Sequence, residues 1–262
     1  MVQNLYEEAR RLKRKGVSYW SLIYKFHKLI AIILVPLRGM IQKGKGTDEN
    51  GKIIVSLTSF DKRIGQVWIT ISTLLCQSLK PKKIILWLAK SQFPGGRQDI
   101  PKRLIKMEKR GLEIRFVDED IRSHKKYYYA MKEYPDDFVV TVDDDMIYPE
   151  NCLEQLMNTY KKHPDCVCAQ FAHWINVGDD GKLAPYMEWT SCYGESTEPN
   201  MHILPVGCGG VLYPPHLLNE NVLNMDDIKI LCPQMDDLWL KSMAVINDVK
   251  AVIALFTIGI SN

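Results

Sequence analysis

Hydrophobic runs and amphipathic periods alternate along the chain between residues 52 and 171. Short apolar runs rich in β-branched residues predict strands, and apolar residues three or four positions apart predict helices. The predicted strands span 52–57, 83–88, 113–117, 138–142 and 166–171, and the predicted helices span 66–78, 101–110, 125–134 and 150–160. Strands separated by helices indicate βαβ units, so we expect an α/β fold with a mostly parallel sheet flanked by helices.

The strand predicted at 138–142 runs directly into three carboxylates, Asp143, Asp144 and Asp145. Its apolar residues do not alternate with polar ones, which is typical of a strand covered on both faces. Adjacent carboxylates repel one another unless water or a divalent cation compensates them. Ligands of open α/β sheets bind beyond the carboxyl ends of the strands, so a hard cation such as Mg2+ or Mn2+ is expected here. A solvated acidic turn is the alternative.

The pattern changes after residue 172. Residues 173–235 are rich in Trp, Tyr, Gly and Pro and show little periodicity. Irregular stretches of this kind, carried by a regular scaffold, usually build a substrate site. A last helix is predicted from Asp236 to about Ile246, and a last strand over residues 250–255.

With 262 residues, 46% of them hydrophobic, the chain can bury a sizeable core. Its net charge of +3 is unevenly spread, because residues 1–46 hold ten basic and two acidic residues, a balance of +8. The rest holds 24 basic and 29 acidic residues, a balance of −5. A polar, Gly-rich stretch at 43–51 follows the basic segment, so we expect a basic arm and linker over 1–50 and one domain over 51–262.

The arm places aromatic residues such as Trp20 and Phe26 beside its basic residues. This mixture suggests a helix lying in a membrane interface, and a helix packed on the domain with a solvated basic face is the alternative. The uncharged run at 29–37 is far shorter than the roughly 20 residues that span a bilayer. With no signal peptide at the start, we expect a cytoplasmic protein, peripheral on the inner face of the membrane if the arm binds there, and no nucleic-acid partner.

Seven cysteines are scattered through apolar stretches. An odd number in such places fits free thiols in a reducing compartment. Cys166 and Cys168 share one face of a predicted strand, but no second cysteine pair stands nearby, so buried thiols are expected rather than a zinc site.

Polar residues that follow the first predicted strand form a candidate nucleotide site. Ser56, Thr58, Ser59 and Arg63 supply hydroxyls and a guanidinium at the carboxyl end of that strand. A helix-capping turn is the alternative. The chain contains no GxGxxG and no GxxxxGK[ST] motif, so neither a dinucleotide fold nor a P-loop is indicated.

Lys125 and Lys126 open the helix that precedes the acidic strand. An ammonium from this helix, together with a cation on the aspartates, would balance the charge of a diphosphate. Either lysine could instead be a plain surface residue.

The Gly-rich stretch at 206–215 and the Asp236-Asp237 pair form a third candidate group. Glycines let a ligand approach the backbone closely, so Gly209 and Gly210, with Trp189 from the irregular region, are expected to bind a substrate. A carboxylate at a helix start should have a depressed pKa, stay ionised at neutral pH and be able to take a proton from an alcohol.

Asp236 could instead be only the N-cap of the last helix, contributing mainly to stability. Glu188, Glu195 and Glu198 are alternative bases in the irregular region.

These motifs resemble those of GT-A-fold glycosyltransferases, especially bacterial family-2-like enzymes of polysaccharide biosynthesis. The resemblance covers about residues 51–248 and rests on five motifs in the family's order, at 53–60, 125–131, 140–145, 207–215 and 235–240. It implies a Rossmann-like GT-A sheet and a nucleotide-sugar donor. Mn2+ or Mg2+ would lie on Asp143 and Asp145, and Asp143 and Asp144 would contact the donor. The acidic pair before the last helix would supply the catalytic base, usually its second member, Asp237.

The activity implied by the resemblance is transfer of a sugar to the hydroxyl of a saccharide acceptor, which would be lipid-linked if the arm lies on a membrane. Family likeness favours an inverting enzyme; in a retaining one, Asp237 would stabilise positive charge on the sugar. The alternatives are a non-catalytic nucleotide-sugar binder of the same fold and a nucleotidyltransferase. The latter should have a Gly-rich loop after the first strand, and residues 56–63 contain no glycine.

Two departures from the family pattern leave details open. No His follows His216 to serve as a C-terminal metal ligand, and residues 88–90 lack an acidic residue to read the nucleotide base. The third ligand, the nucleotide and the sugar are therefore not predicted.

Overall fold

A computed structural model describes residues 44, 46–193 and 198–254. Most of the basic arm (1–43 and residue 45) lies outside the described residues, so its predicted contact with a membrane and the boundary near residue 50 stay predictions. None of the helices in the described ranges has the length and hydrophobicity needed to cross a bilayer.

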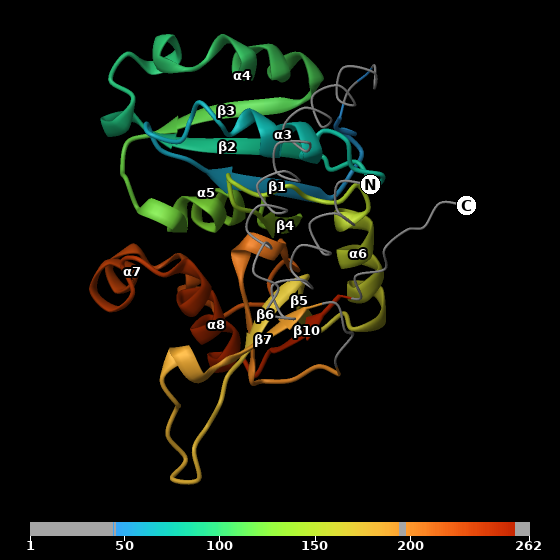
Figure 1. The fold of residues 1–262 in the computed structure, drawn as a ribbon, viewed down its shortest axis with the longest axis vertical. Helices are drawn as coiled ribbons and strands as arrows, with labels where there is room; N and C mark the ends of the chain where they lie inside the picture. Colours follow the sequence, from blue (N-terminus) through green and yellow to red (C-terminus); the bar gives the residue numbers. More distant parts are fainter. Residues whose placement is uncertain (1–43, 45, 194–197, 255–262) are drawn as a thin grey trace, which may run out of the picture.

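A seven-stranded sheet forms the centre of the molecule, with the spatial order β10-β5-β9-β4-β1-β2-β3 (Figure 1). Its strands run parallel except β9, which lies antiparallel between β4 and β5. The strands are β1 (Ile53–Thr58), β2 (Lys83–Ala89), β3 (Leu112–Val117), β4 (Phe138–Thr141), β5 (Cys166–Ala169), β9 (Val211–Tyr213) and β10 (Lys250–Ile253). The predicted α/β class and mostly parallel sheet are confirmed.

Helices cover both faces of this sheet. One face packs against α3 (Trp68–Leu74), α4 (Lys102–Met107) and α6 (Cys152–Lys162), and the other against α5 (Lys125–Glu133), α7 (Met225–Leu231) and α8 (Asp236–Ile246). Successive residues of β4 point to opposite layers, because Val139 packs with α5 while Val140 packs with α3 and α6. The prediction of a strand covered on both faces is therefore confirmed.

The predicted helices are present, but their ends differ. The helix predicted at 66–78 is regular only over α3, although its predicted apolar face is buried. β-branched residues weaken helices, and the Thr70 hydroxyl lies 2.9 Å from the carbonyl oxygen of Asp144 and 2.8 Å from that of Met146. The helix therefore also holds the loop that follows β4 and carries the three aspartates, residues 142–149, which we call the acidic loop.

The prediction that residues 173–235 are irregular missed regular structure. They contribute to an antiparallel sheet of order β7-β6-β8, comprising β6 (Phe171–Trp174), β7 (Thr190–Tyr193) and β8 (Ile203–Pro205), and they contain β9 and α7. These strands have three or four residues, too few for a period to be read. The single strand predicted at 166–171 is likewise two strands, β5 and β6, in different sheets.

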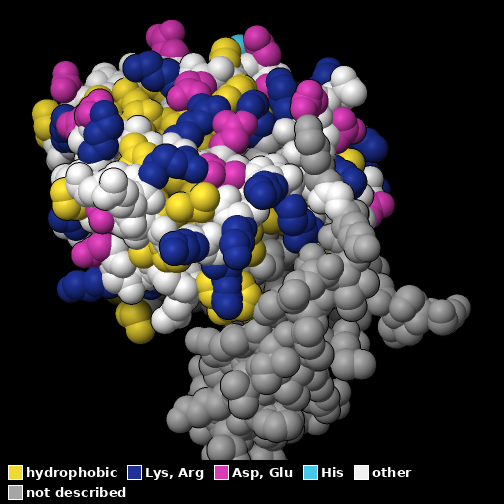
Figure 2. Space-filling model, turned by 90° about the horizontal axis from the view of Figure 1, so that it is seen from above, with side chains coloured by type: hydrophobic (Ala, Val, Ile, Leu, Met, Phe, Trp, Pro, Cys, Tyr) yellow, Lys and Arg dark blue, Asp and Glu magenta, His cyan; other side chains and the backbone are white. Residues whose placement is uncertain are grey.

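On the face seen in Figure 2, Lys and Arg side chains lie among acidic and apolar ones rather than in one basic patch. The seven cysteines are thiols rather than disulfides, and Cys166 and Cys168 are buried, as predicted for structural thiols.

The segment just before β1 packs on the edge of the domain. The amide of Gly46 donates to the carbonyl of Arg110 at 2.7 Å, and that of Asp48 donates to the carbonyl of Pro81 at 2.9 Å. Gly111 has a φ of +113°, and a Cβ there would overlap the Thr47 side chain. Only glycine fits this position without strain.

Gly111→Ala should therefore lower the free energy of unfolding by about 1–3 kcal/mol, through backbone strain and the Thr47 overlap. Gly65→Ala is the control, because a Cβ at Gly65 has open space around it. Urea denaturation of both variants measures the difference, and equal stabilities would contradict this view of how the segment packs.

Candidate functional site

Five carboxylates approach one another beyond the carboxyl ends of the central strands. Asp143, Asp144 and Asp145 follow β4, and Asp236 and Asp237 begin α8. We call these residues, with Lys126 and Arg63, the acidic cluster. Its carboxylates come from segments about 90 residues apart in sequence, and the inserted strand β9 and the Gly-rich stretch before it lie between them along the chain.

Lys126 is the cation at the centre of the acidic cluster. Its Nζ donates to Asp143 Oδ1 at 2.5 Å and lies 3.3 Å from Asp236 Oδ2, and its side chain is only 10% exposed. Burial by itself lowers the pKa of Lys126, but the two neighbouring carboxylates outweigh burial and raise it. The ammonium therefore stays charged and joins α5, β4 and α8.

Arg63 is the second cation. Its Nη1 lies 2.7 Å from Asp144 Oδ1 and 3.2 Å from Asp145 Oδ2. Asp144 is buried and also accepts a hydrogen bond from Ser59 Oγ at 2.5 Å, so it fixes the loop after β1. Asp145 is 52% exposed and faces solvent. The hydrogen bond to Asp144 raises the pKa of Arg63.

Gly207 is where the charged groups converge. Its amide donates to Asp237 Oδ1 at 3.1 Å. A Cβ on Gly207 would lie 3.3 Å from Asp237 Oδ1, 3.4 Å from Lys126 Nζ and 3.6 Å from Asp143 Oδ1. A Cβ here would be tight against Asp237 Oδ1 and in contact with the other two groups, so glycine leaves room for the three side chains to meet.

Two expectations for the acidic pair were wrong. Burial raises the pKa of Asp237 to about 7, with Asp236 and Asp143 adding to the rise and Lys126 opposing it, whereas a depressed pKa was expected. Asp236 does not cap α8, because Met235 holds the N-cap position without a side-chain bond and Asp236 pairs with Lys126. Burial and neighbouring negative charge raise the pKa of Asp237 by more than the start of the helix lowers it. Asp236 pairs with the buried ammonium of Lys126, and its side chain is therefore not available to cap the helix.

Three residues predicted to bind the donor make hydrogen bonds or ion pairs with other residues of the protein. Ser56 is fully buried, and its hydroxyl donates to the carbonyl of Lys126 and accepts from Trp87 Nε1 at 2.9 Å. Thr58 Oγ1 donates to the carbonyl of Trp87 at 2.8 Å. Lys125 is buried and pairs with Asp120. These contacts support the position of α5 and β2, and the donor-binding roles of Ser56, Thr58 and Lys125 stay predictions.

Tyr148 is a residue of the site that the sequence did not reveal. Its buried hydroxyl accepts from the amide of Asp143 at 2.8 Å and lies 3.2 Å from the carbonyl of Cys208. It joins the acidic loop to the Gly-rich stretch. A lone tyrosine seven residues beyond the end of β4 has no pattern that would single it out.

The predicted substrate residues Gly209, Gly210 and Trp189 are not all together. Gly209 packs against Phe171, and Gly210, with a φ of +91°, leads into β9. Trp189 lies further away on the β6–β7 hairpin. A row of ring contacts links the two places, with centroid distances of 5.2 Å for Phe171–His173, 5.4 Å for His173–Tyr186 and 5.4 Å for Tyr186–Trp189.

Of the alternative bases, Glu188 and Glu198 lie within the described residues. Glu188 lies on the same hairpin as Trp189, in the 3₁₀ turn Tyr186–Glu188, whereas the three atoms nearest to a Cβ on Gly207 belong to Asp237, Lys126 and Asp143. Glu195 lies outside the described residues.

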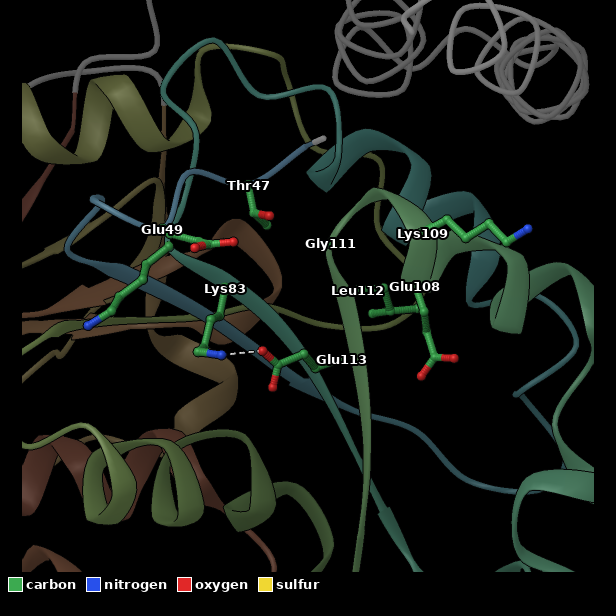
Figure 3. A pocket seen from close by; sticks show the side chains of 9 residues that line it. Thr47, Glu49, Lys83, Glu108, Lys109, Gly111, Leu112 and Glu113 are labelled. Carbon is green, nitrogen blue, oxygen red and sulfur yellow. Dashed lines mark hydrogen bonds and ion pairs between the residues drawn. The ribbon is translucent and has the colours of Figure 1, made fainter. Parts of the chain in front are cut away.

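A hollow of about 410 Å³ lies elsewhere, at the amino ends of β2 and β3 (Figure 3). Lys83 and Glu113 pair across it, and the hydrogen bond between them raises the pKa of Lys83. Because it lies at the opposite edge of the sheet from the acidic cluster, this hollow is no part of the candidate site.

The acidic cluster has the composition that a hard cation requires. With every group ionised, five carboxylates and two protein cations leave a charge of −3. Asp143 Oδ2 and Asp145 Oδ1 take no part in the ion pairs with Lys126 and Arg63. No three Asp, Glu, His or Cys side chains in the described ranges group into a metal site. One or two carboxylates completed by phosphate oxygens are a usual Mg2+ site, so the residues fit a metal that shares a diphosphate.

Residues 68–211, more than half of the chain, match the family model for glycosyl transferase family 2. The chain belongs to this family. The match contains α5, the acidic loop and the first part of the Gly-rich stretch (residues 206–211), and ends at the start of β9. A comparison with curated proteins gives no match.

Solved structures of similar fold include the mannosyltransferase PcManGT from Pyrobaculum calidifontis in complex with GDP-Man and Mn2+, with 11% identity, a TM-score of 0.38, and coverage of 64% of this chain and 47% of that one. TarS from S. aureus has 15% identity, a TM-score of 0.45, and coverage of 79% and 58%. The UTP-bound UGPase from Acinetobacter baumannii has 9% identity, a TM-score of 0.48, and coverage of 78% and 86%. The chain thus spans about half the length of the first two, and likenesses at this level say nothing about its substrate.

The buried position of Ser56 gives a direct prediction. Ser56→Ala leaves the Trp87 indole and the Lys126 carbonyl without their partner, so the free energy of unfolding should fall by about 1–3 kcal/mol. Affinity for a nucleotide ligand should change little. Ser242→Ala is the matched control, because the Ser242 hydroxyl only donates to the carbonyl of Leu238 on an exposed helix face. A Ser56→Ala protein of normal stability but weak nucleotide binding would instead show that the Ser56 hydroxyl contacts the nucleotide.

Proposed function

We propose that this protein is a metal-dependent glycosyltransferase that moves a sugar from a nucleotide-sugar donor to a hydroxyl of a saccharide acceptor. The observation that carries the proposal is the convergence of Asp143, Lys126 and Asp237 around Gly207, in a chain of glycosyl transferase family 2. Such a site brings a carboxylate for a metal, a cation for phosphate and a carboxylate for proton transfer within a few ångströms.

The donor diphosphate would lie between Arg63, Lys126 and the acidic loop. The excess negative charge of the cluster would repel a diphosphate, so Mn2+ or Mg2+, held by Asp143 and Asp145, is part of the proposal. When bound, the cation neutralises charge on the leaving diphosphate. Asp144 takes an indirect part, because Ser59 and Arg63 hold it and it fixes the loop after β1.

Asp237 is the proposed general base. A carboxylate with a pKa of about 7 is partly ionised at neutral pH and is a stronger base than an ordinary aspartate. It would take the proton of the acceptor hydroxyl as the oxygen attacks the anomeric carbon, which inverts the configuration there. The amide of Gly207 keeps one carboxylate oxygen oriented through the reaction.

The acceptor would approach along the ring-lined surface from Phe171 to Trp189, which begins beside Gly209. Tyr186 in this row is 51% exposed. Aromatic surfaces with few polar groups suit bulky ligands that need orientation. A lipid-linked acceptor at a membrane belongs to the proposal through the +8 charge of residues 1–46.

The experiment that tests the function is a panel of UDP-, GDP-, ADP- and dTDP-sugars with Mn2+, read by thermal shift and by release of the nucleotide. Stabilisation by a nucleotide-sugar, with release of its nucleoside diphosphate, supports the proposal. Stabilisation by nucleoside triphosphates alone, with pyrophosphate release in the presence of a sugar phosphate, would identify a nucleotidyltransferase. Binding without turnover for any acceptor would leave a non-catalytic binder.

Asp145→Asn should abolish Mn2+-dependent turnover and leave the melting temperature nearly unchanged, because Asp145 is 52% exposed and its ion pair with Arg63 spans 3.2 Å. Asp180→Asn, at a site 59% exposed on the β6–β7 hairpin, is the control and should keep full activity. Turnover that survives in Asp145→Asn, or in the unchanged protein with excess chelator, rules out the metal role.

Asp237→Asn should reduce kcat by about 100- to 10,000-fold, because the amide cannot accept the proton. The affinity for the nucleotide-sugar donor should not change. Asp236→Asn should instead lower the stability and reduce kcat by a smaller factor. Lys126 then loses its ion pair with residue 236 but keeps its pair with Asp143. In the unchanged protein kcat/KM should fall about tenfold per pH unit below about 7, because the base is then protonated. A pH-independent kcat/KM between pH 5 and 8, or a normal kcat in Asp237→Asn, places the base elsewhere.

A further inference from the structure

The acidic cluster depends on two segments that are remote in sequence. Lys126 lies in the first turn of α5, and Asp236 and Asp237 lie in the first turn of α8, both on the same face of the sheet (Figure 1). The ion pair between Lys126 and Asp236 spans this junction, but an ion pair at 3.3 Å does not by itself fix the direction of a helix. A second set of contacts, centred on His124, does.

His124 is buried, with only 1% of its surface exposed, and both of its ring nitrogens are engaged. Nε2 lies 2.7 Å from the carbonyl oxygen of Cys232, and Nδ1 lies 3.0 Å from the hydroxyl of Tyr127. A carbonyl can only accept, so Nε2 carries the proton and Nδ1 of the neutral ring accepts from Tyr127. Burial lowers the pKa of His124, which keeps the ring neutral although Asp236 opposes the shift.

The turn at 232–235 transmits this contact to α8. Cys232 Sγ donates to the carbonyl of Met235 at 3.2 Å, and the same carbonyl accepts the first helical hydrogen bond, from the amide of Trp239 at 3.1 Å. Beside His124, Ser123 Oγ donates to the carbonyl of Gln234 at 3.4 Å. Two consecutive residues before α5 thus hold the backbone of the turn that ends at Asp236.

We propose that His124 is a positioning residue, which sets the separation between Lys126 and the first turn of α8 and so holds Asp237 in place beside Gly207. The inference rests on the proposed function, because it gives His124 its effect through Asp237. If His124 only filled space, any ring of similar volume would replace it. If it positions α8, the hydrogen bond donated by Nε2 is also required, so variants can separate the two roles.

Three variants separate positioning from space filling. His124→Phe keeps an aromatic ring and removes both hydrogen bonds, whereas His124→Gln places an amide N–H close to where Nε2 donates. Tyr127→Phe keeps His124 and its bond to the Cys232 carbonyl, and removes only the hydroxyl that donates to Nδ1 and orients the ring. The probe is the nucleotide-sugar that gives the largest thermal shift in the panel, with kcat measured as nucleoside diphosphate release.

His124→Phe should reduce kcat by about 10- to 100-fold, the loss expected when a catalytic group moves by about 1 Å. Its Kd for the nucleotide-sugar should remain within about twofold, because Asp143 still holds Lys126 and the other proposed donor contacts, Arg63 and the acidic loop, do not touch His124. His124→Gln should recover most of kcat. Backbone amides of residues 234–238 should exchange hydrogen faster in His124→Phe than in His124→Gln, a readout independent of turnover.

Normal kcat in His124→Phe, or equal loss in His124→Gln, overturns the positioning role. If His124→Phe does not fold, Tyr127→Phe decides: kcat reduced about threefold or more with unchanged Kd supports the role, and normal kcat overturns it. Asp237→Asn is made alongside. An inactive Asp237→Asn with an active His124→Phe refutes only the role of His124, whereas an active Asp237→Asn refutes the proposed base and, with it, the role of His124.

Discussion

The electrostatic balance at the carboxyl edge of the central sheet constrains the rest of the structure. Five carboxylates meet there, and Lys126 and Arg63 are the cations that pair with them in the described part of the chain. An ammonium as buried as that of Lys126 costs free energy unless its partners are well placed. The surrounding contacts provide that placement: Ser56 holds the Lys126 carbonyl, and Asp143 and Asp236 hold its Nζ.

Backbone geometry brings the second half of the site to the first. Strand β9 enters the sheet antiparallel between β4 and β5, so the Gly-rich stretch before it passes the end of β4. Gly207 then lies against Asp237 and Lys126, and Tyr148 joins Cys208 to Asp143. The acidic loop, the Gly-rich stretch and α8 are therefore held together by direct contacts. A shift in any of them changes the distance between the proposed metal ligands and the proposed base.

Sequence patterns predicted the parts of the fold whose signals are local. Buried parallel strands such as β1 and β4 appear as unbroken apolar runs, and the Asp143–Asp145 and Asp236–Asp237 motifs stand at element ends where position alone suggests a site. Short antiparallel strands such as β6 and β8 lack enough residues for a period. The ion-pair partners of the two lysines cannot be read from local sequence either. Lys125 pairs with Asp120, so it is Lys126 that pairs with Asp143 in the acidic cluster. The raised pKa of Asp237 follows from burial and like charge, and both arise only when the chain has folded.

The central claim is that Asp143 and Asp145 hold a divalent cation together with the diphosphate of the donor. Mn2+ binding, followed by electron paramagnetic resonance with and without a nucleoside diphosphate, tests it most directly. Two carboxylates leave most of a six-coordinate shell to water or phosphate, so the account predicts that the nucleoside diphosphate tightens Mn2+ binding at least about tenfold and that Asp145→Asn removes this gain. Mn2+ binding that is unaffected by the diphosphate, or that persists unchanged in Asp145→Asn, would contradict it.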